Sequence, residues 1–535
     1  STPVPQDGAA DVPRDRALSW TPGALAETHD VYLGARFADV NDASRANPMG
    51  VLVSQGQTAA TYDPGPLELG QTYYWRVDEV NGPPDYTIFK GQVWSFEVEP
   101  YAYPLEGIAV TASSFDEGAA PENVVNSSGL DENDGHSTRT SDMWLSSAAG
   151  DQPTFIEFTF DRLYKLHQML VWNYNIQFEA FLGYGLKDVT VEYSENGVDW
   201  MALGDFEFAQ ATSVAGDTAN TTIDFAGRAV QAVRLTANSN WGGALPQYGL
   251  SEVRFLYIPT FAREPQPADG DLDVPLDAIL SWRPGREAAV HEVHLGADPG
   301  ALALVGATAR PTLPTETLEF GRAYYWRVDE VNEAEPISLW PSKVWTFQTL
   351  EYAIIDNFES YTDDIDAGEA IFDTWLDGWV NNTGSTVGYL DAPFAERTVV
   401  RSGAQSMPLL YDNASAPFYS EAERDLGGMA WNVRGADSLR LFVSGRADGS
   451  NDPEPFYVAV EDGAGRVAVV THPDVAVRAG WNEWRIPFSD LTGVNLGNVR
   501  TMYVGLGDRD NPRAGGAGLV FIDDIGFGRS ASADD

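Results

Sequence analysis

The sequence contains no cysteine among its 535 residues. This absence excludes disulfide bonds, zinc sites built on thiolates and cysteine nucleophiles. Histidine is scarce as well, with six residues scattered along the chain. The motifs HExxH, GxSxG and the Walker loop, which mark metalloproteases, serine hydrolases and nucleotide hydrolases, do not occur. We therefore expect the chain to hold together by packing and not to be an enzyme.

Positive charge is the second shortage. Lysine and arginine total 33 against 79 aspartate and glutamate residues, which gives a net charge of −46 at pH 7. Because phosphate backbones and anionic membranes are bound by clustered basic side chains, nucleic acid is excluded as a partner. No run of 18 apolar residues occurs, so no membrane insertion is expected. Solubility explains most of the surplus carboxylates, and only a few of them are needed to supply the oxygen ligands that Ca²⁺ prefers.

The composition that remains is typical of β-structure. Aromatic residues make up 12% of the chain, beside 51 glycines and 32 prolines. A chain of 58.2 kDa is too long for a single core and should divide into several domains. Length and composition thus predict an all-β protein of three to five domains, and the repeat and the resemblances described below imply four tandem antiparallel β-sandwich domains.

One stretch of nine residues occurs twice. Residues 73–81 read Tyr-Tyr-Trp-Arg-Val-Asp-Glu-Val-Asn, and the same nine residues return at 324–332. In the first copy, alternation puts Trp75 on one face and Arg76 on the other, which is the period of a β-strand. The stretch therefore predicts a strand inside a repeated β module.

Further short strands flank each copy, separated by proline and glycine turns. They are expected at residues 17–20, 29–34, 71–80 and 93–98, and again at 279–282, 291–296, 322–331 and 344–348. The offset is 262 residues from Trp20 to Trp282 but 251 from Trp75 to Trp326, so the second copy is 11 residues shorter in between. Tryptophans at equivalent strand positions are expected to be core residues: Trp20, Trp75, Trp94, Trp282, Trp326 and Trp345.

The two segments that contain these strands, residues 1–100 and 260–350, resemble fibronectin type III-like modules. The similarity is to the variant with a YYWRVDEVN strand, which accompanies carbohydrate-binding modules in exported bacterial proteins. It implies two immunoglobulin-like sandwiches that act as spacers and bind no ligand of their own.

Residues 101–259 form a different unit, with alternating strand candidates at 154–160, 168–173, 188–193, 232–236 and 251–255. The stretches 122–126, 142–146, 187–194 and 249–254 resemble a discoidin domain, the C-type domain of coagulation factors V and VIII. The resemblance implies a jelly roll that takes ligands in the loops at one end, with a structural Ca²⁺ beside them.

Residues 351–528 make the last unit. It opens with Ile-Asp-Asn-Phe-Glu-Ser-Tyr at 355–361 and closes with Val-Phe-Ile-Asp-Asp-Ile-Gly-Phe at 520–527. It resembles the galactose-binding-like jelly rolls of carbohydrate-binding modules, which implies that its first and last strands lie together and share a Ca²⁺. The tail at 529–535 is expected to be disordered or to lead into something further.

Carboxylates from distant strands that converge on one point make a Ca²⁺ site. In the last unit the candidates are Asp356, Glu359, Asp523 and Asp524, with backbone oxygens from residues 401–406. Asp524 is favoured over Asp523, because Phe521, Asp523 and Ile525 share the other face of their strand. The alternative is that these carboxylates are solvated strand ends.

In the discoidin-like unit the resemblance places Ca²⁺ near Asn126, Ser141 and Glu252. Members of that family usually have Asp-Gly where this chain has Asn126 and Ser127. The loop that follows is longer here, and Asp131 or Asp134 is expected to supply the missing charge.

A sugar site needs an aromatic face against the apolar side of a pyranose ring, and planar polar groups for its hydroxyls. For each candidate, burial or a plain surface position is the alternative. In the discoidin-like unit the candidates are His136, Arg139, Trp172, Tyr174 and Trp241; in the last unit they are Trp375, Trp379, Tyr389 and Tyr419. Four further tryptophans are assigned to the core: Trp144, Trp431, Trp481 and Trp484.

Together these features predict a non-catalytic, Ca²⁺-stabilised protein, secreted or on the cell surface, that adheres to a polysaccharide or glycoconjugate. The first residue is serine, which is expected if a signal peptide has been removed. Two alternatives stay open. The chain is a structural subunit that binds copies of itself in a surface fibre or matrix, or it is the accessory binding region of a larger polysaccharide-degrading enzyme.

Overall fold

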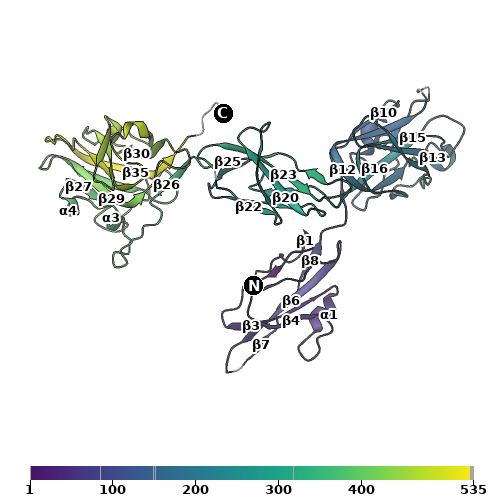
Figure 1. Ribbon diagram of the computed structural model, residues 1–535, viewed down its shortest axis with the longest axis horizontal. Helices are drawn as coiled ribbons and strands as arrows, with labels where there is room; N and C mark the ends of the chain where they lie inside the picture. The colour runs from purple at the N-terminus through teal and green to yellow at the C-terminus, as the bar shows by residue number, and fades with distance from the viewer. Residues whose placement is uncertain (1, 85, 149, 151, 317, 531–535) are drawn as a thin grey trace. The chain divides into compact units, whose positions relative to one another are not determined.

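The computed structural model describes residues 2–84, 86–148, 150, 152–316 and 318–530, and its sheets confirm the all-β prediction. The strands fall into four groups in chain order, shown by the colour sequence in Figure 1. Contacts divide the chain into two compact units, Ser1–Thr260 and Phe261–Asp535, and the division of each unit into two domains stays a prediction. Of the predicted disordered tail, residues 531–535 lie outside the described part.

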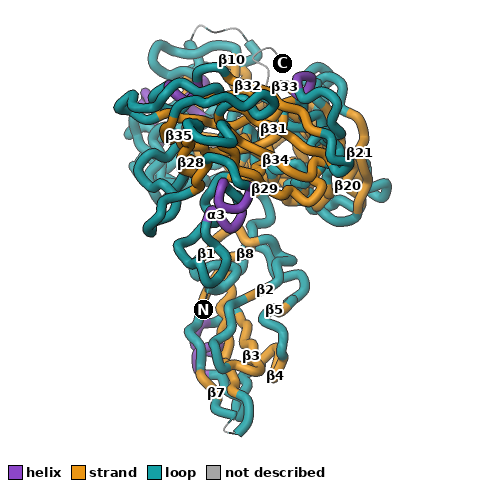
Figure 2. The backbone as a smooth tube through the Cα atoms, turned by 90° about the vertical axis from the view of Figure 1, so that its left-hand side faces the viewer, coloured by secondary structure: helices purple, strands orange, loops and turns teal. Residues whose placement is uncertain are grey.

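The first group is a sandwich of two sheets, one in the order β1-β8-β6-β3-β4 with β7 paired to β6, and the other of β2 and β5. Figure 2 shows β3 beside β4 and β2 beside β5. Its core packs Leu18, Val31, Trp75 and Phe96 between the sheets. The elements are β1 (Ala9–Val12), β2 (Leu18–Ser19), β3 (Ala26–Gly34), α1 (Phe37–Asp42), β4 (Leu52–Gln57), β5 (Thr61–Tyr62), β6 (Thr72–Asn81), β7 (Ile88–Phe89) and β8 (Trp94–Val98).

The third group repeats this plan, in the order β18-β25-β23-β20-β21 with β24 on β23, and a second sheet β17-β19-β22. Its tryptophans repeat the first core, because the ring centroids of Trp75 and Trp94 and those of Trp326 and Trp345 are both 4.8 Å apart. The predicted core role holds for all six tryptophans, although Trp94 is only half-buried. The strands are β17 (Arg263–Gln266), β18 (Asp271–Val274), β19 (Ile279–Arg283), β20 (Val290–Gly296), β21 (Ala303–Thr308), β22 (Thr312–Pro314), β23 (Ala323–Val331), β24 (Leu339–Pro341) and β25 (Trp345–Thr349).

The second group forms an eight-stranded sheet in the order β11-β16-β12-β15-β13-β14, with β10 on β12 and β9 on β16. The separate strands predicted at 154–160 and 168–173 are one strand, β12, whose pairing with β15 shifts register between Thr159 and Tyr164. The elements are β9 (Tyr103–Pro104), β10 (Ala109–Ala112), η1 (Pro121–Val124), η2 (Thr140–Asp142), β11 (Trp144–Leu145), β12 (Phe155–Asn173), α2 (Glu179–Leu182), β13 (Asp188–Ser194), β14 (Met201–Glu207), β15 (Thr221–Ala237) and β16 (Gly249–Ile258).

The fourth group packs the sheet β27-β28-β35-β30-β33, with β26 on β35, against the sheet β29-β34-β31-β32. The first and last strands pair directly, as predicted. The elements are β26 (Tyr352–Asp356), α3 (Ile371–Thr374), α4 (Gly378–Asn381), β27 (Ser385–Val387), β28 (Met407–Asp412), β29 (Ser420–Met429), β30 (Ser438–Gly445), β31 (Phe456–Asp462), β32 (Val467–His472), η3 (Val475–Val477), β33 (Asn482–Pro487), η4 (Phe488–Asp490), β34 (Val499–Leu506) and β35 (Ala517–Gly528).

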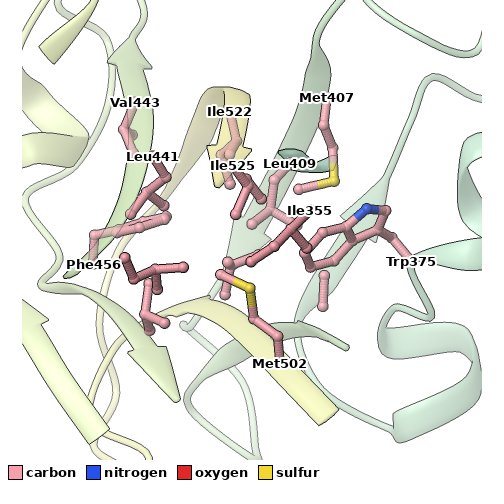
Figure 3. Close-up of a cluster of buried hydrophobic side chains, with 14 of the residues drawn as sticks. Ile355, Trp375, Met407, Leu409, Leu441, Val443, Phe456, Met502, Ile522 and Ile525 are labelled. Carbon is pink, nitrogen blue, oxygen red and sulfur yellow. The ribbon is translucent and has the colours of Figure 1, made fainter. Parts of the chain in front are cut away.

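The core of the fourth group lies between its two sheets (Figure 3). Alternation in β30 sends Leu441 and Val443 inward, where they meet Phe456 of β31 and Ile522 of β35. Among the tryptophans assigned to cores, Trp144 and Trp431 are fully buried and Trp484 packs half-buried against this cluster. Trp481 is the exception, since it is half-buried just before β33 and is not part of the cluster.

Candidate functional site

An apolar hollow of the fourth group lies where α3, α4 and the segment after β27 meet. It has a volume of about 460 Å³. Trp379 stands at it with 81% of its surface exposed, and Leu390 with 84%. The other lining residues are Ile365, Phe372, Asp373, Leu376, Asp377, Val380, Thr386, Val387, Tyr389 and Phe394. Large apolar side chains exposed together in this way are uncommon on a protein surface, which makes this hollow a candidate binding site.

Hydrogen bonds from the backbone to Asp377 fix the position of Trp379. The carboxylate of Asp377 caps α4, because one oxygen accepts from the backbone N–H of Trp379 at 3.0 Å and the other from that of Val387 at 2.8 Å. The helix is followed by its C-cap residue Asn382, whose φ of 58° lies in the left-handed region that asparagine tolerates. The exposed ring therefore projects from a short, capped turn tied to β27.

Tyr389 forms part of the wall and is fixed by Glu396. Its hydroxyl donates to the Glu396 carboxylate. Burial raises the pKa of Tyr389, and the hydrogen bond to Glu396 adds to the rise. Burial alone would raise the pKa of Glu396, but hydrogen bonds from Thr398, Tyr389 and backbone N–H groups hold it at about 2. The Tyr389 ring is thus anchored by an ionised carboxylate.

Of the four aromatics predicted for this unit, the structure brings Trp379 and Tyr389 together and separates the other two. Trp375 is a correction: it is fully buried, so its ring has no face for a sugar. Its indole N–H donates to Asp356 at 2.8 Å, and Figure 3 shows its ring directed toward Ile355. Tyr419 is half-buried beside Tyr457, away from the lining of the hollow.

Sequence reasoning missed a polar network on the outer face of the sheet β29-β34-β31-β32. Tyr457 donates to Glu421 at 2.8 Å, and the same carboxylate pairs with Arg509 at 3.0 Å. Burial raises the pKa of Glu421, while Arg509 opposes the rise. The Arg509 guanidinium also covers the ring of Tyr503 at 4.4 Å. The signal was present in the alternation of β31, which directs Tyr457 away from the core.

The candidates of the discoidin-like unit lie at the end of β12 and in the segments that follow η1, β12 and β15. His136, Trp172 and Tyr174 are all at least 98% buried, which corrects their predicted role in stacking on a sugar. The indole N–H of Trp172 donates to the carbonyl of Asp134 at 2.9 Å. Arg139 is exposed and pairs with Asp142 at 2.8 Å. Trp241 is half-exposed, with the Lys187 ammonium 4.9 Å from its ring.

The predicted Ca²⁺ ligand Asp356 does not fit a metal site. Its carboxylate accepts from the backbone N–H of Phe358 at 2.8 Å, the Tyr361 hydroxyl at 2.6 Å and the Trp375 indole at 2.8 Å. The Arg424 guanidinium also pairs with it. Four donors, one of them a cation, occupy the lone pairs that Ca²⁺ would need.

The three remaining carboxylates all contact the loop at 401–405. Glu359 accepts from the backbone N–H of Ala404 at 2.9 Å, and Asp523 from that of Arg401 at 2.9 Å. Asp523 is fully buried, and this burial raises its pKa to about 6. Asp524, which the sequence favoured, pairs with the Arg401 guanidinium instead. The buried, uncompensated charge of Asp523 fits a cation better than that of Asp524.

In the discoidin-like unit, Glu252 fits the predicted cation site. One carboxylate oxygen accepts from the backbone N–H of Ser127 at 3.2 Å, and the other is buried with no hydrogen-bond partner. Burial raises the pKa of Glu252 to about 8. A cation beside it would supply the missing partner and favour the ionised form.

The other residues predicted around Glu252 are already engaged locally. Asn126 accepts from the backbone N–H of Ser128, Asp131 from that of Gly135, and the Ser141 hydroxyl donates to Asp142. Asp134 is paired with Arg254 at 2.8 Å. Across residues 2–530 as far as they are described, no three or more His, Asp or Glu side chains cluster closely enough to hold a metal between them.

None of the family models compared with the chain matches it, and no curated protein does. Solved structures do. The family 32 carbohydrate-binding module of NanJ from Clostridium perfringens, in complex with galactose, is 14% identical, with 29% of this chain and 98% of that one covered and a TM-score of 0.22. The family 11 module from Clostridium thermocellum, in complex with a β-1,3-1,4-mixed-linked tetrasaccharide, is 17% identical, with 34% and 96% covered and a TM-score of 0.21.

A family 89 glycoside hydrolase from Clostridium perfringens, in complex with its substrate GlcNAc-α-1,4-galactose, is also similar, at 14% identity and a TM-score of 0.22. That match covers 28% of this chain and spans about 14% of the length of the hydrolase. Similarity at this level is too low to carry an argument about function. Within the described part of the chain, none of the helices is long and apolar enough to cross a membrane.

Proposed function

We propose that the protein is a non-catalytic carbohydrate-binding protein that adheres to a polysaccharide through its C-terminal jelly roll. The observation that carries the proposal is the exposed ring of Trp379 at the hollow that Tyr389 and Leu390 also line. An exposed indole is the side chain best suited to cover the apolar face of a pyranose ring. The resemblance of the sequence to carbohydrate-binding jelly rolls points to the same class of ligand.

The fixed geometry of this hollow supports ligand binding without catalysis. Asp377 and Glu396 are committed to hydrogen bonds that hold Trp379 and Tyr389 in place. A preorganised aromatic surface binds with less loss of side-chain entropy than a mobile one. Ca²⁺ has a stabilising role in this proposal, at Glu252 in one jelly roll and near Glu359 and Asp523 in the other, and the protein acts outside the cell.

Retention of the purified full-length chain on polysaccharides tests the proposal. Suitable probes are an insoluble mixed-linkage β-1,3-1,4-glucan, immobilised galactose and N-acetylgalactosamine, and a broad glycan array, all at millimolar Ca²⁺. We expect wild-type protein to be retained on at least one probe and the Trp379→Ala variant to be lost from it.

Phe181→Ala is the matched control, because Phe181 is an aromatic side chain that is 87% exposed in the other jelly roll. It should bind as the wild type does. If wild type binds none of the probes, or if both variants bind as well as wild type, the proposal is wrong.

A further inference from the structure

Three loops of the discoidin-like unit meet around His136. The backbone N–H of His136 donates to the carbonyl of Asp217 at 2.7 Å, and the carbonyl of His136 accepts from Gly216 at 2.9 Å. This isolated antiparallel bridge puts the side chains of His136 and Asp217 on the same side, where directly opposed residues are neighbours. Asn175, just after β12, donates to the carbonyl of Ser137, which also contacts the imidazole of His136.

The carbonyl of Ser137 fixes the proton on the imidazole. His136 Nδ1 lies 3.0 Å from that oxygen, and a carbonyl only accepts, so Nδ1 carries the hydrogen. In the neutral ring Nε2 is then an acceptor. It is fully buried and has no hydrogen-bond partner.

Asn175 and Asp217 present acceptors in the same way. The amide N–H₂ of Asn175 donates to the carbonyls of Val214 at 2.7 Å and Ser137 at 3.4 Å, so its oxygen is left over. That oxygen and the second carboxylate oxygen of Asp217 are buried without a partner. The first carboxylate oxygen of Asp217 accepts from the Thr212 hydroxyl at 2.8 Å.

The three leftover atoms are therefore all acceptors. Asp217 is only 8% exposed, and its second carboxylate oxygen is buried without a hydrogen-bond partner. A buried carboxylate without a counter-charge is costly, and so is each buried polar atom without a hydrogen bond. A cation satisfies both needs at once, because it accepts lone pairs from all three atoms and balances the charge.

We propose that His136 Nε2, Asn175 Oδ1 and Asp217 Oδ2 bind one divalent transition-metal cation. An imidazole nitrogen beside two oxygens suits Zn²⁺ or Mn²⁺ better than Ca²⁺, which prefers oxygen ligands alone. The site shares no residue with the predicted Ca²⁺ site at Glu252. Its role is to tie the three loops together at one end of the jelly roll.

Metal titration of the full-length chain tests this proposal. After removal of metals with a chelator, Zn²⁺ and Mn²⁺ are titrated by calorimetry, and bound metal is counted by elemental analysis. We expect one equivalent to bind to wild type, and at least tenfold weaker binding to Asp217→Asn and His136→Gln. Binding that the two variants retain in full would overturn the proposal, as would the absence of any bound metal, which would leave a bound water as the partner.

Two controls keep the result specific. Glu252→Gln removes the predicted Ca²⁺ ligand and His167→Gln removes a half-exposed histidine of the same unit, and both should bind Zn²⁺ as wild type does. Because substitutions of buried residues can prevent folding, the visible spectrum of the wild-type protein loaded with Co²⁺ serves as a second measurement. Absorption bands that indicate nitrogen ligation are expected, and a spectrum of oxygen ligands alone would contradict the assignment.

Discussion

The two copies of the nine-residue strand have identical sequences and different surroundings. In the first copy Arg76 is fully buried, donating to the carbonyls of Val40 at 2.6 Å and Ala43 at 2.9 Å, beside the C-terminal end of α1. Its guanidinium lies 4.2 Å from the ring of Tyr32. In the second copy the equivalent Arg327 has a side chain that is 37% exposed and pairs with Asp329 at 2.9 Å.

The cause is the 11-residue difference in the intervening segment. The first copy has α1 (Phe37–Asp42) there, and the described part of the second copy has no helix at that place. The residue opposite the arginine changes too, from Tyr32 to His294, which pairs with Asp329 at 3.2 Å. The exposure of a side chain therefore depends on the elements that pack over it and not on the sequence of its own strand.

Trp375 and Trp379 repeat this contrast within one jelly roll. They are four residues apart, yet one is fully buried and the other is 81% exposed. Trp375 follows α3, whose Ile371 enters the core, whereas Trp379 lies in α4, which buries none of its residues. The covered ring supports the fold, and the open ring is free to bind.

The largest difference in stability is expected between the alanine variants of these two tryptophans. Trp375→Ala removes a fully buried ring and its hydrogen bond to Asp356, and large aromatic truncations in a core cost about 3–5 kcal/mol. Trp379→Ala should change the free energy of unfolding by less than about 0.5 kcal/mol, as exposed substitutions do. Chemical denaturation of both variants measures the difference. Equal losses of stability would show that the open ring is structural.

The next largest difference in stability is expected between the leucine variants of the two arginines. Arg76→Leu leaves Asp78 buried without its cation, and breaking a buried pair costs about 3 kcal/mol. Arg327→Leu removes a half-exposed guanidinium, and His294 still lies 3.2 Å from the buried Asp329, so a smaller loss of about 1 kcal/mol is expected. Thermal unfolding of the two single variants compares them directly. A larger loss for Arg327→Leu would contradict the role given to α1 as the cover.

The smallest effect concerns a covered carboxylate, Glu179 of α2. Burial raises its pKa to about 7 from an ordinary value near 4.5. The folded state therefore binds more protons than the unfolded state between these values, and stability falls as the pH rises from about 4.5 to 7. The loss is on the order of 2 kcal/mol. Glu179→Gln should remove this part of the pH dependence, measured by denaturation at pH 4.5 and 7.5.

The exposed Glu195 provides the open counterpart, since Glu195→Gln should leave the pH profile unchanged. A Glu179→Gln profile that matches the wild type would mean that the pKa of Glu179 is the same in the folded and unfolded states.

Local patterns in the sequence predicted much of the fold. Alternation and the repeated stretch located β3, β6, β20 and β23 to within a few residues, because strand period and turn residues are encoded by near neighbours. They did not show that β12 runs on through a register shift, since that depends on its pairing with β15.

The candidate sites were predictable only in part, for the same reason. Trp379 and Tyr389 could be named from residue type, but burial of Trp172 and Tyr174 depends on loops far along the chain. The engagement of Asp356 depends on Arg424, which is 68 residues away. No local pattern records such contacts.

The most direct test of the central claim is the affinity of the full-length chain for a glycan that it retains, measured by calorimetry for wild type, Trp379→Tyr and Trp379→Ala. The account predicts that Trp379→Ala weakens binding at least tenfold, which corresponds to about 1.4 kcal/mol. Trp379→Tyr keeps an aromatic face and should recover most of that affinity. An unchanged affinity in Trp379→Ala would contradict the claim that this open ring is the binding surface.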